Sequence, residues 1–248
     1  MKKTNPYSVW TVPPEALTLH PDQVDVWRIR SNLPVDIMDR LEATLSEDEK
    51  ERALRFHFAA DRDRFVAAHG GLRDVLSRYL HCEPNQFSFS KNSYGKPALH
   101  DHKLEFNLSH SGDFALIAIT QECKVGIDVE RIRSGISSHV IAQQYFSKQE
   151  FAELQSLPLE RRETAFFTCW TRKEAYIKAQ GLGLSLPLES FDVSLTPNEP
   201  ALLRATRPDS QEATRWTLFS LAVDPCYQAA VAVHGPHPEF RLWDWNTR

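Results

Sequence analysis

The stretch that most constrains the fold is the run 125–130 (VGIDVE), which is typical of a single β-strand. Its β-branched residues alternate with Gly126, Asp128 and Glu130. Side chains of a strand alternate between its two faces, so Asp128 and Glu130 share one face, with Cα atoms about 6.6 Å apart. Two carboxylates at such a short distance repel each other unless a positive charge lies between them. Alone, such a pair favours a solvated strand end; the alternative is a site for a hard cation such as Mg²⁺, which prefers oxygen ligands.

A second stretch, 170–178 (WTRKEAYIK), falls within a pattern that predicts a long helix over 161–180. Trp170, Glu174 and Lys178 are spaced by four residues and therefore share one helix face. Taken alone, Glu174 and Lys178 form an ordinary surface pair on a helix. If the helix faces the strand, however, Glu174 adds a third carboxylate. Mg²⁺ would neutralise such a cage and keep positions open for phosphate oxygens.

Composition narrows the classes of function. The chain has 248 residues, which suits one large domain or two of about 120. The net charge is −4 and the basic residues form no long block, which argues against nucleic acid as a partner. No apolar run approaches the roughly 20 residues that cross a bilayer, and the N-terminus lacks the apolar segment of a signal peptide. The four cysteines lie far apart, so we expect reduced thiols in a cytoplasmic protein.

The order of expected elements is helices, strands, helices, strands. We expect helices over 36–56 with a break near Ser46, after Asp61, after a capping box at Ser147–Glu150, and over 161–180. We expect strands over 24–29, 87–90, 104–109, 114–120, 191–195, 202–205, 215–223 and 229–233, in addition to the central strand. The pair Gly70-Gly71, inside a helical pattern, predicts close packing against another element.

This order predicts an α+β fold made of two similar halves. The halves are expected at 1–120 and 121–248, each with an antiparallel sheet and a layer of helices, and they are expected to meet near the central strand. The sequence shows no clear internal repeat, so this pseudo-symmetry is inferred only from the order of the elements.

A turn is expected at 109–113 (SHSGD), between two predicted strands. Small hydroxyl and glycine residues let backbone N–H groups approach an anion, and His110 could add a charge-assisted hydrogen bond. Taken alone, the segment is more typical of an ordinary surface loop. The chain lacks the glycine-rich phosphate and dinucleotide motifs, the His-Glu-x-x-His zinc motif and the Gly-x-Ser-x-Gly elbow. The common ATPase, dehydrogenase, zinc-protease and serine-hydrolase functions are therefore not indicated.

Several motifs, in their order and spacing, closely resemble the 4′-phosphopantetheinyl transferases of the Sfp type. The resemblance covers roughly residues 52–193. The matching runs are 93–97 (SYGKP), 106–112 (FNLSHSG), 125–130 (VGIDVE), 145–150 (YFSKQE), 170–178 (WTRKEAYIK) and 181–191 (GLGLSLPLESF). The resemblance implies two pseudo-symmetric α+β halves with CoA and Mg²⁺ in the cleft between them.

The resemblance also implies roles for individual residues. The metal ligands would be Asp128, Glu130 and Glu174, with Asp128 also at CoA, and Lys178 would lie at the reacting phosphate. Five further residues would hold CoA: Ser109 and His110 near its phosphates, Lys96 at the nucleotide end, and Arg52 and Arg64 at the 3′-phosphate. The family often has a second basic residue three positions before the one matching Arg52, where this chain has Glu49.

The predicted function is transfer of 4′-phosphopantetheine from CoA to a serine hydroxyl of an apo acyl or peptidyl carrier protein, with adenosine 3′,5′-bisphosphate as by-product. Glu174 is the candidate base and Lys178 the candidate acid. By resemblance the enzyme would be a monomer, and neither nucleic acid nor a membrane is an expected partner. Two alternatives stay open: a Mg²⁺-dependent phosphohydrolase acting on CoA or a nucleotide, and a CoA-binding protein without activity. The sequence does not say which carrier is modified.

Overall fold

The chain folds into two compact units. The computed structural model describes residues 9–99, 103–135, 138–197 and 199–246. The first unit comprises Met1–Ser90, Pro97–Glu122 and Glu239–Arg248, and the second comprises Lys91–Lys96 and Cys123–Pro238. Each unit combines a mainly or wholly antiparallel sheet with helices, which confirms the predicted α+β class.

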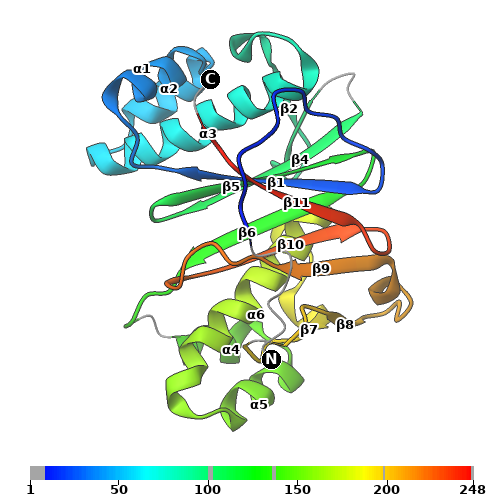
Figure 1. Cartoon of the computed structure of the whole chain (residues 1–248). Coiled ribbons are helices and arrows are strands. Elements are labelled where there is room, and N and C mark those ends of the chain that lie inside the picture. The colour runs from blue at the N-terminus through cyan, green and yellow to red at the C-terminus, as the bar shows by residue number, and fades with distance from the viewer. Residues whose placement is uncertain (1–8, 100–102, 136–137, 198, 247–248) are drawn as a thin grey trace. The chain divides into compact units, whose positions relative to one another are not determined.

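The main sheet of the first unit has the order β11-β1-β5-β4, and α3 packs against its strands (Figure 1). The helices α1 and α2 pack on α3. The elements are β1 (Gln23–Arg30), α1 (Val35–Ala43), α2 (Glu47–Leu54), α3 (Ala59–Leu80), the 3₁₀ turn η1 (Pro84–Gln86), β4 (Leu104–Ser111), β5 (Phe114–Gln121) and β11 (Glu239–Asp244). The short strands β2 (Phe89–Lys91) and β3 (Pro97–Leu99) pair separately. The predicted break near Ser46 is confirmed, since Ser46 caps α2.

The glycine pair of α3 marks two close contacts. A Cβ added at Gly70 would lie 2.7 Å from the Cβ and the carbonyl oxygen of Leu41 on α1. One added at Gly71 would lie 2.5 Å from Cδ1 of Ile29 on β1. Both separations are too short for real carbon atoms. At Gly70 the neighbouring atoms include the backbone of α1, which cannot turn away, whereas at Gly71 the near atom is the tip of a side chain. The close packing predicted from this pair is confirmed.

The last strand corrects the predicted division of the chain. We expected residues 239–248 in the second half, but β11 pairs in parallel with β1, which lies more than 200 residues earlier. The guanidinium of Arg241 holds both carboxylate oxygens of the buried Asp25 across this pair, at 2.6 and 2.8 Å. The loop 91–96 likewise belongs to the second unit. Pairing over such a sequence separation leaves no local signal.

The second unit has a three-stranded antiparallel sheet of order β6-β10-β9, against which the long helix α6 packs (Figure 1). Its elements are β6 (Val125–Arg131), α4 (Ser138–Tyr145), α5 (Lys148–Ser156), α6 (Leu159–Gln180), η2 (Gly183–Ser185), η3 (Leu188–Ser190), β7 (Phe191–Val193), β8 (Leu203–Thr206), η4 (Glu212–Arg215), β9 (Trp216–Ser220) and β10 (Tyr227–His234). The predicted capping box of Ser147 and Glu150 is present. Within the described ranges, no helix combines the length and the apolar character needed to cross a membrane.

The helix α6 passes very close to β6 at Gly126. A Cβ added there would lie 2.1 Å from the carbonyl oxygen of Ala175 and 2.3 Å from the amide nitrogen of Ala179. Strand alternation puts Gly126, Asp128 and Glu130 on the same face, so the two carboxylates lie on the helix side of β6. The missing side chain therefore allows the helix to lie beside the acidic face of the strand.

We expect Gly126→Ala to destabilise the protein, because the added methyl group meets helix backbone that cannot rotate away. Overpacking of a core typically costs about 1–3 kcal/mol, and a backbone clash belongs at the upper end. The free energy of unfolding, from denaturant titration, measures this cost. Gly135→Ala is the control, since its added Cβ meets no atom within 4 Å and only the backbone conformation (φ +88°) is strained. Equal losses in the two variants would contradict the close β6–α6 contact.

Candidate active site

The acidic face of β6 meets a basic residue of α6. Asp128 is 4% exposed, and its Oδ1 accepts a hydrogen bond from Nζ of Lys178 over 2.6 Å. Lys178 lies in the last turn of α6, one turn after Glu174, so both side chains project from the same helix face. The predicted strand and the predicted helix thus place their charged residues against each other.

Glu174 experiences the charges of both carboxylates on β6. Burial raises the pKa of this half-buried group, the charge of Asp128 raises it further, Lys178 lowers it, and Glu130 adds a smaller increase. Each carboxylate therefore makes ionisation of the helix residue less favourable. The structure brings Asp128, Glu130, Glu174 and Lys178 into one charged cluster, which we call the β6–α6 cluster.

This cluster suits Mg²⁺ by chemistry but is not a closed metal cage. All its potential ligands are carboxylate oxygens, which Mg²⁺ prefers, and a divalent ion would relieve the repulsion that raises the pKa of Glu174. Among the described residues, however, no three His, Cys, Asp or Glu side chains are grouped as a metal site. The ammonium of Lys178 instead neutralises part of the charge on Asp128.

A pocket of about 220 Å³ opens beside Glu130. Its other lining residues are Arg133, Ile141, Phe166 and Trp170, and the rings of Phe166 and Trp170 stack with centroids 5.9 Å apart. The sequence placed Trp170 on the face of Glu174 but did not identify the other three. Phe166 lies one helical turn before Trp170, and this spacing could have predicted that Phe166 lies beside Trp170.

Lys96 lies where β6 begins and α6 ends. Its Nζ donates to the carbonyl oxygens of Val125 and Ala179, at 3.1 and 3.4 Å. The neighbouring Asn92 donates from its side-chain amide to the carbonyl of Gly181, the residue that caps α6, over 2.8 Å. The loop that carries the predicted CoA residue Lys96 is thus attached to the two elements of the cluster. Asn92 was not singled out by the sequence.

In the first unit, His110 lies in a strand and not in the predicted turn, and Ser109, predicted at the junction of strand and turn, lies within the same strand. The strand β4 continues to Ser111, and the turn consists of Gly112 and Asp113 alone. The register pairs Ser109 with Leu116 and His110 with Ala115. Because two residues are enough for a hairpin loop, β4 continues up to the turn and its residues keep alternating between the two faces of the sheet. Ser109 is buried, whereas His110, on the opposite face, is exposed.

The two predicted 3′-phosphate residues have different partners. The exposed Arg52, at the end of α2, places its guanidinium carbon 5.2 Å from the ring centroid of Phe65. Arg64 precedes Phe65 on α3 and pairs through NH1 with Asp61 over 2.8 Å. Both arginines keep exposed surface.

Glu49, at a position where the resemblance leads to the expectation of a basic residue, has a structural partner. Burial opposes ionisation, but hydrogen bonds from His69 and from the backbone of Ser46, together with the charge of Arg73, hold the pKa of Glu49 at about 2. The guanidinium of Arg73 is buried, 2.8 Å from the carboxylate, and the carboxylate completes the capping box of α2. Glu49 is therefore a charge-paired cap.

Comparisons with known proteins show which family the chain belongs to. A family model described as the 4′-phosphopantetheinyl transferase superfamily matches residues 124–232, and a model of the N-terminal part of 4′-phosphopantetheinyl transferase matches residues 36–122. The chain is 42% identical over 240 residues to the 4′-phosphopantetheinyl transferase HetI of Nostoc sp., covering 95% of this chain and 98% of the relative.

More distant relatives carry related names. The 4′-phosphopantetheinyl transferase Sfp of Bacillus subtilis is 32% identical over 203 residues, covering 82% of this chain and 87% of the relative. The L-aminoadipate-semialdehyde dehydrogenase-phosphopantetheinyl transferase of Mus musculus is 28% identical over 210 residues, covering 78% and 68%. The chain belongs to the 4′-phosphopantetheinyl transferase superfamily and is an enzyme that transfers phosphopantetheine to carrier proteins.

Proposed function

We propose that this transferase takes the phosphopantetheine group from CoA, and that Mg²⁺ bound by Asp128, Glu130 and Glu174 supports the reaction. The β6–α6 cluster carries this proposal, because three mutually repelling carboxylates beside Lys178 form a site that a divalent cation and a phosphate group would stabilise together. The acceptor is a serine hydroxyl of an apo acyl or peptidyl carrier protein, and the by-product is adenosine 3′,5′-bisphosphate.

In this mechanism the serine oxygen attacks the phosphorus that bears the pantetheine arm. A new P–O bond forms as the bond to the second phosphate of the pyrophosphate breaks, and the nucleotide leaves. Glu174 is the candidate general base that would receive the serine proton. Lys178 stabilises the leaving phosphate or gives it a proton. Bound Mg²⁺ would neutralise part of the charge on the pyrophosphate.

The remaining predicted residues would hold the part of CoA that does not react. We assign Ser109 and His110 to its phosphates and Lys96 to the nucleotide end. Arg52 and Arg64 are assigned to the 3′-phosphate. The exposure of Arg52 and the partial exposure of the Arg64 side chain support this last assignment, and so does the buried Arg73, which neutralises Glu49. The location of CoA in a cleft between the halves stays a prediction.

We further propose that the enzyme acts in the cytoplasm and as a monomer, on CoA and carrier proteins. The four cysteines all lie in described segments and form no disulfide, which agrees with a reducing compartment. We propose no role for nucleic acid or for a membrane.

The function is tested by incubating the protein with CoA, Mg²⁺ and a panel of apo-carriers, with mass spectrometry as the readout. We expect one carrier to gain the mass of a single phosphopantetheine group on its serine. Incubation without any carrier is the control, and there CoA should stay intact. Turnover of CoA in that control, with no carrier modified, would support the phosphohydrolase in place of the transferase.

Removing single charges from the β6–α6 cluster tests the metal assignment. We expect Asp128→Asn to weaken Mg²⁺-dependent CoA binding, because the remaining carboxylates hold the ion poorly. Glu174→Gln should lower turnover at least ~10²-fold, the lower end for loss of a positioned base. Calorimetry with CoA at varied Mg²⁺ and single-turnover kinetics measure the two effects. The control is Asp224→Asn, which alters an exposed carboxylate of the same unit. Native Mg²⁺ dependence in Asp128→Asn would rule out this residue as a ligand.

The 3′-phosphate assignment predicts a change of ligand preference. Charge-assisted hydrogen bonds contribute about 1.5–3 kcal/mol, so Arg64→Ala should weaken CoA binding roughly 10- to 100-fold. Binding of dephospho-CoA, which lacks only the 3′-phosphate, should hardly change. The matched control is Arg62→Ala, which removes an arginine of the same helix that pairs with Glu42. An unchanged ratio of the two affinities in Arg64→Ala would remove Arg64 from the pocket.

A further inference from the structure

Two basic residues that the proposed chemistry does not use lie directly before Glu174. Arg172 is 2% exposed and Lys173 is 0% exposed. Burying a charge is costly unless it is paired and hydrogen-bonded, and arginine and lysine are seldom buried completely. Two successive buried cations in the helix that carries Glu174 and Lys178 therefore require a physical reason.

The ammonium of Lys173 has three acceptors from three different elements. Its Nζ lies 2.8 Å from Oε2 of Glu150 on α5, and it donates to the carbonyl oxygens of Leu188 over 2.7 Å and of Phe191 over 2.6 Å. An ammonium group has three protons, so its donor capacity is matched. This one side chain connects α6 to α5, to η3 and to the start of β7.

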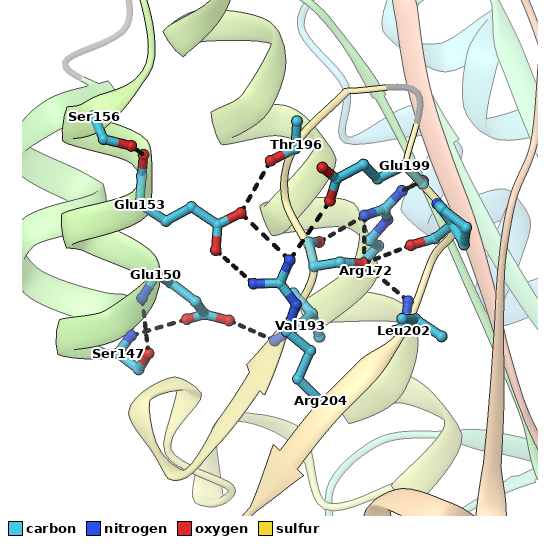
Figure 2. Close-up of polar contacts among 12 residues, drawn as sticks. Ser147, Glu150, Glu153, Ser156, Arg172, Val193, Thr196, Glu199, Leu202 and Arg204 are labelled. Atoms are coloured by element: carbon cyan, nitrogen blue, oxygen red, sulfur yellow. Dashed lines mark hydrogen bonds and ion pairs between the residues drawn. The ribbon is translucent and has the colours of Figure 1, made fainter.

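The carboxylate of Glu150 is held as completely as the ammonium. It is 1% exposed, and it accepts from the backbone N–H of Val193 over 2.7 Å and of Ser147 over 2.9 Å (Figure 2). Glu150 therefore completes the cap of α5, binds the backbone of β7 and pairs with Lys173. Backbone hydrogen bonds therefore hold both members of the ion pair in place.

Arg172 makes a second attachment in another direction. One terminal nitrogen donates to the carbonyl oxygen and to Oγ of Ser194, at 2.6 and 2.8 Å. The other donates to the carbonyl of Glu199 over 3.1 Å and to Oγ of Ser220 over 3.0 Å. Figure 2 shows this guanidinium at the segment that leads from β7 toward β8. Arg172 thus ties α6 to that segment and to the end of β9.

The directional contacts matter because hydrophobic burial is non-directional, whereas hydrogen bonds have narrow geometry. The contact at Gly126 leaves no room for a methyl group. Successive helix residues point about 100° apart, so the sites that hold residues 172 and 173 also set the direction of Glu174.

We propose that Arg172 and the Lys173–Glu150 pair are positioning residues that hold α6 in the rotation and height that present Glu174 and Lys178 to Asp128. This inference rests on the proposed function of the β6–α6 cluster, to which it adds the determinants of geometry. None of the three side chains touches the reacting groups in this mechanism.

The test replaces the ion pair by a neutral pair of similar size, Glu150→Gln/Lys173→Met. Replacing a buried ion pair as a unit often retains stability, whereas removing one partner leaves an uncompensated charge. We expect the double variant to unfold cooperatively, with turnover at least about tenfold lower, Mn²⁺ binding in the presence of CoA at least about tenfold weaker by EPR, and KM for the carrier within about twofold of native.

The matched control is Glu153→Gln/Arg204→Met, which removes a partly exposed ion pair joining α5 to β8 (Figure 2). It should change turnover and Mn²⁺ affinity less than about twofold. If the first double variant fails to fold, Arg172→Lys decides. It keeps the charge but loses the planar fork that reaches four acceptors, and should lower turnover about three- to tenfold with KM for the carrier unchanged.

Native turnover and native Mn²⁺ affinity in a folded Glu150→Gln/Lys173→Met variant would overturn the proposal, as would native values in Arg172→Lys. Amide hydrogen exchange separates this outcome from failure of the proposed function. Exchange in residues 170–180 should rise in the double variant and stay native in the control, whether or not the native protein proves to be active with CoA. Unchanged exchange in both variants would also contradict the positioning role.

Discussion

The close contact between β6 and α6 is the constraint on which the site depends. At Gly126 the backbones of the strand and the helix are so close that no methyl group fits between them. Strand alternation then directs Asp128 and Glu130 to the helix side, and the helical repeat of about 3.6 residues directs Glu174 and Lys178 to the strand side. The close contact therefore brings the carboxylates of the strand and of the helix near each other. The ion pair between Lys178 and Asp128 offsets part of the repulsion between these carboxylates.

Two kinds of contact hold the helix α6 against the sheet of the second unit. The apolar core of the second unit, which includes Phe166, Ile177, Leu218 and Ala230, supplies the driving force that holds α6 on the sheet. Burial of this kind does not select one rotation of the helix. The buried polar contacts around Lys173 do, since each of its protons has a defined acceptor. Stability and geometry are thus provided by different groups.

The first unit illustrates how the partners of one residue explain its role. The resemblance leads to the expectation of a basic residue at position 49, whereas Glu49 caps α2 and neutralises the buried Arg73. Arg52 is exposed, and the half-buried Arg64 pairs with Asp61. A departure from a family pattern is therefore better understood from the partners of the substituted residue than from its charge alone.

The sequence by itself determined the α+β class, the helix α6, the capping box of α5 and the residue types of the cluster, because periodicity and caps act over a few residues. It also identified the family, since the motifs keep their order. Only the tertiary structure decided that β11 pairs with β1, that His110 lies in a strand, and that Lys173 meets Glu150. These contacts join segments distant in sequence or depend on where a register stops. They are selected by burial and hydrogen-bond satisfaction of the whole fold, which no local pattern records.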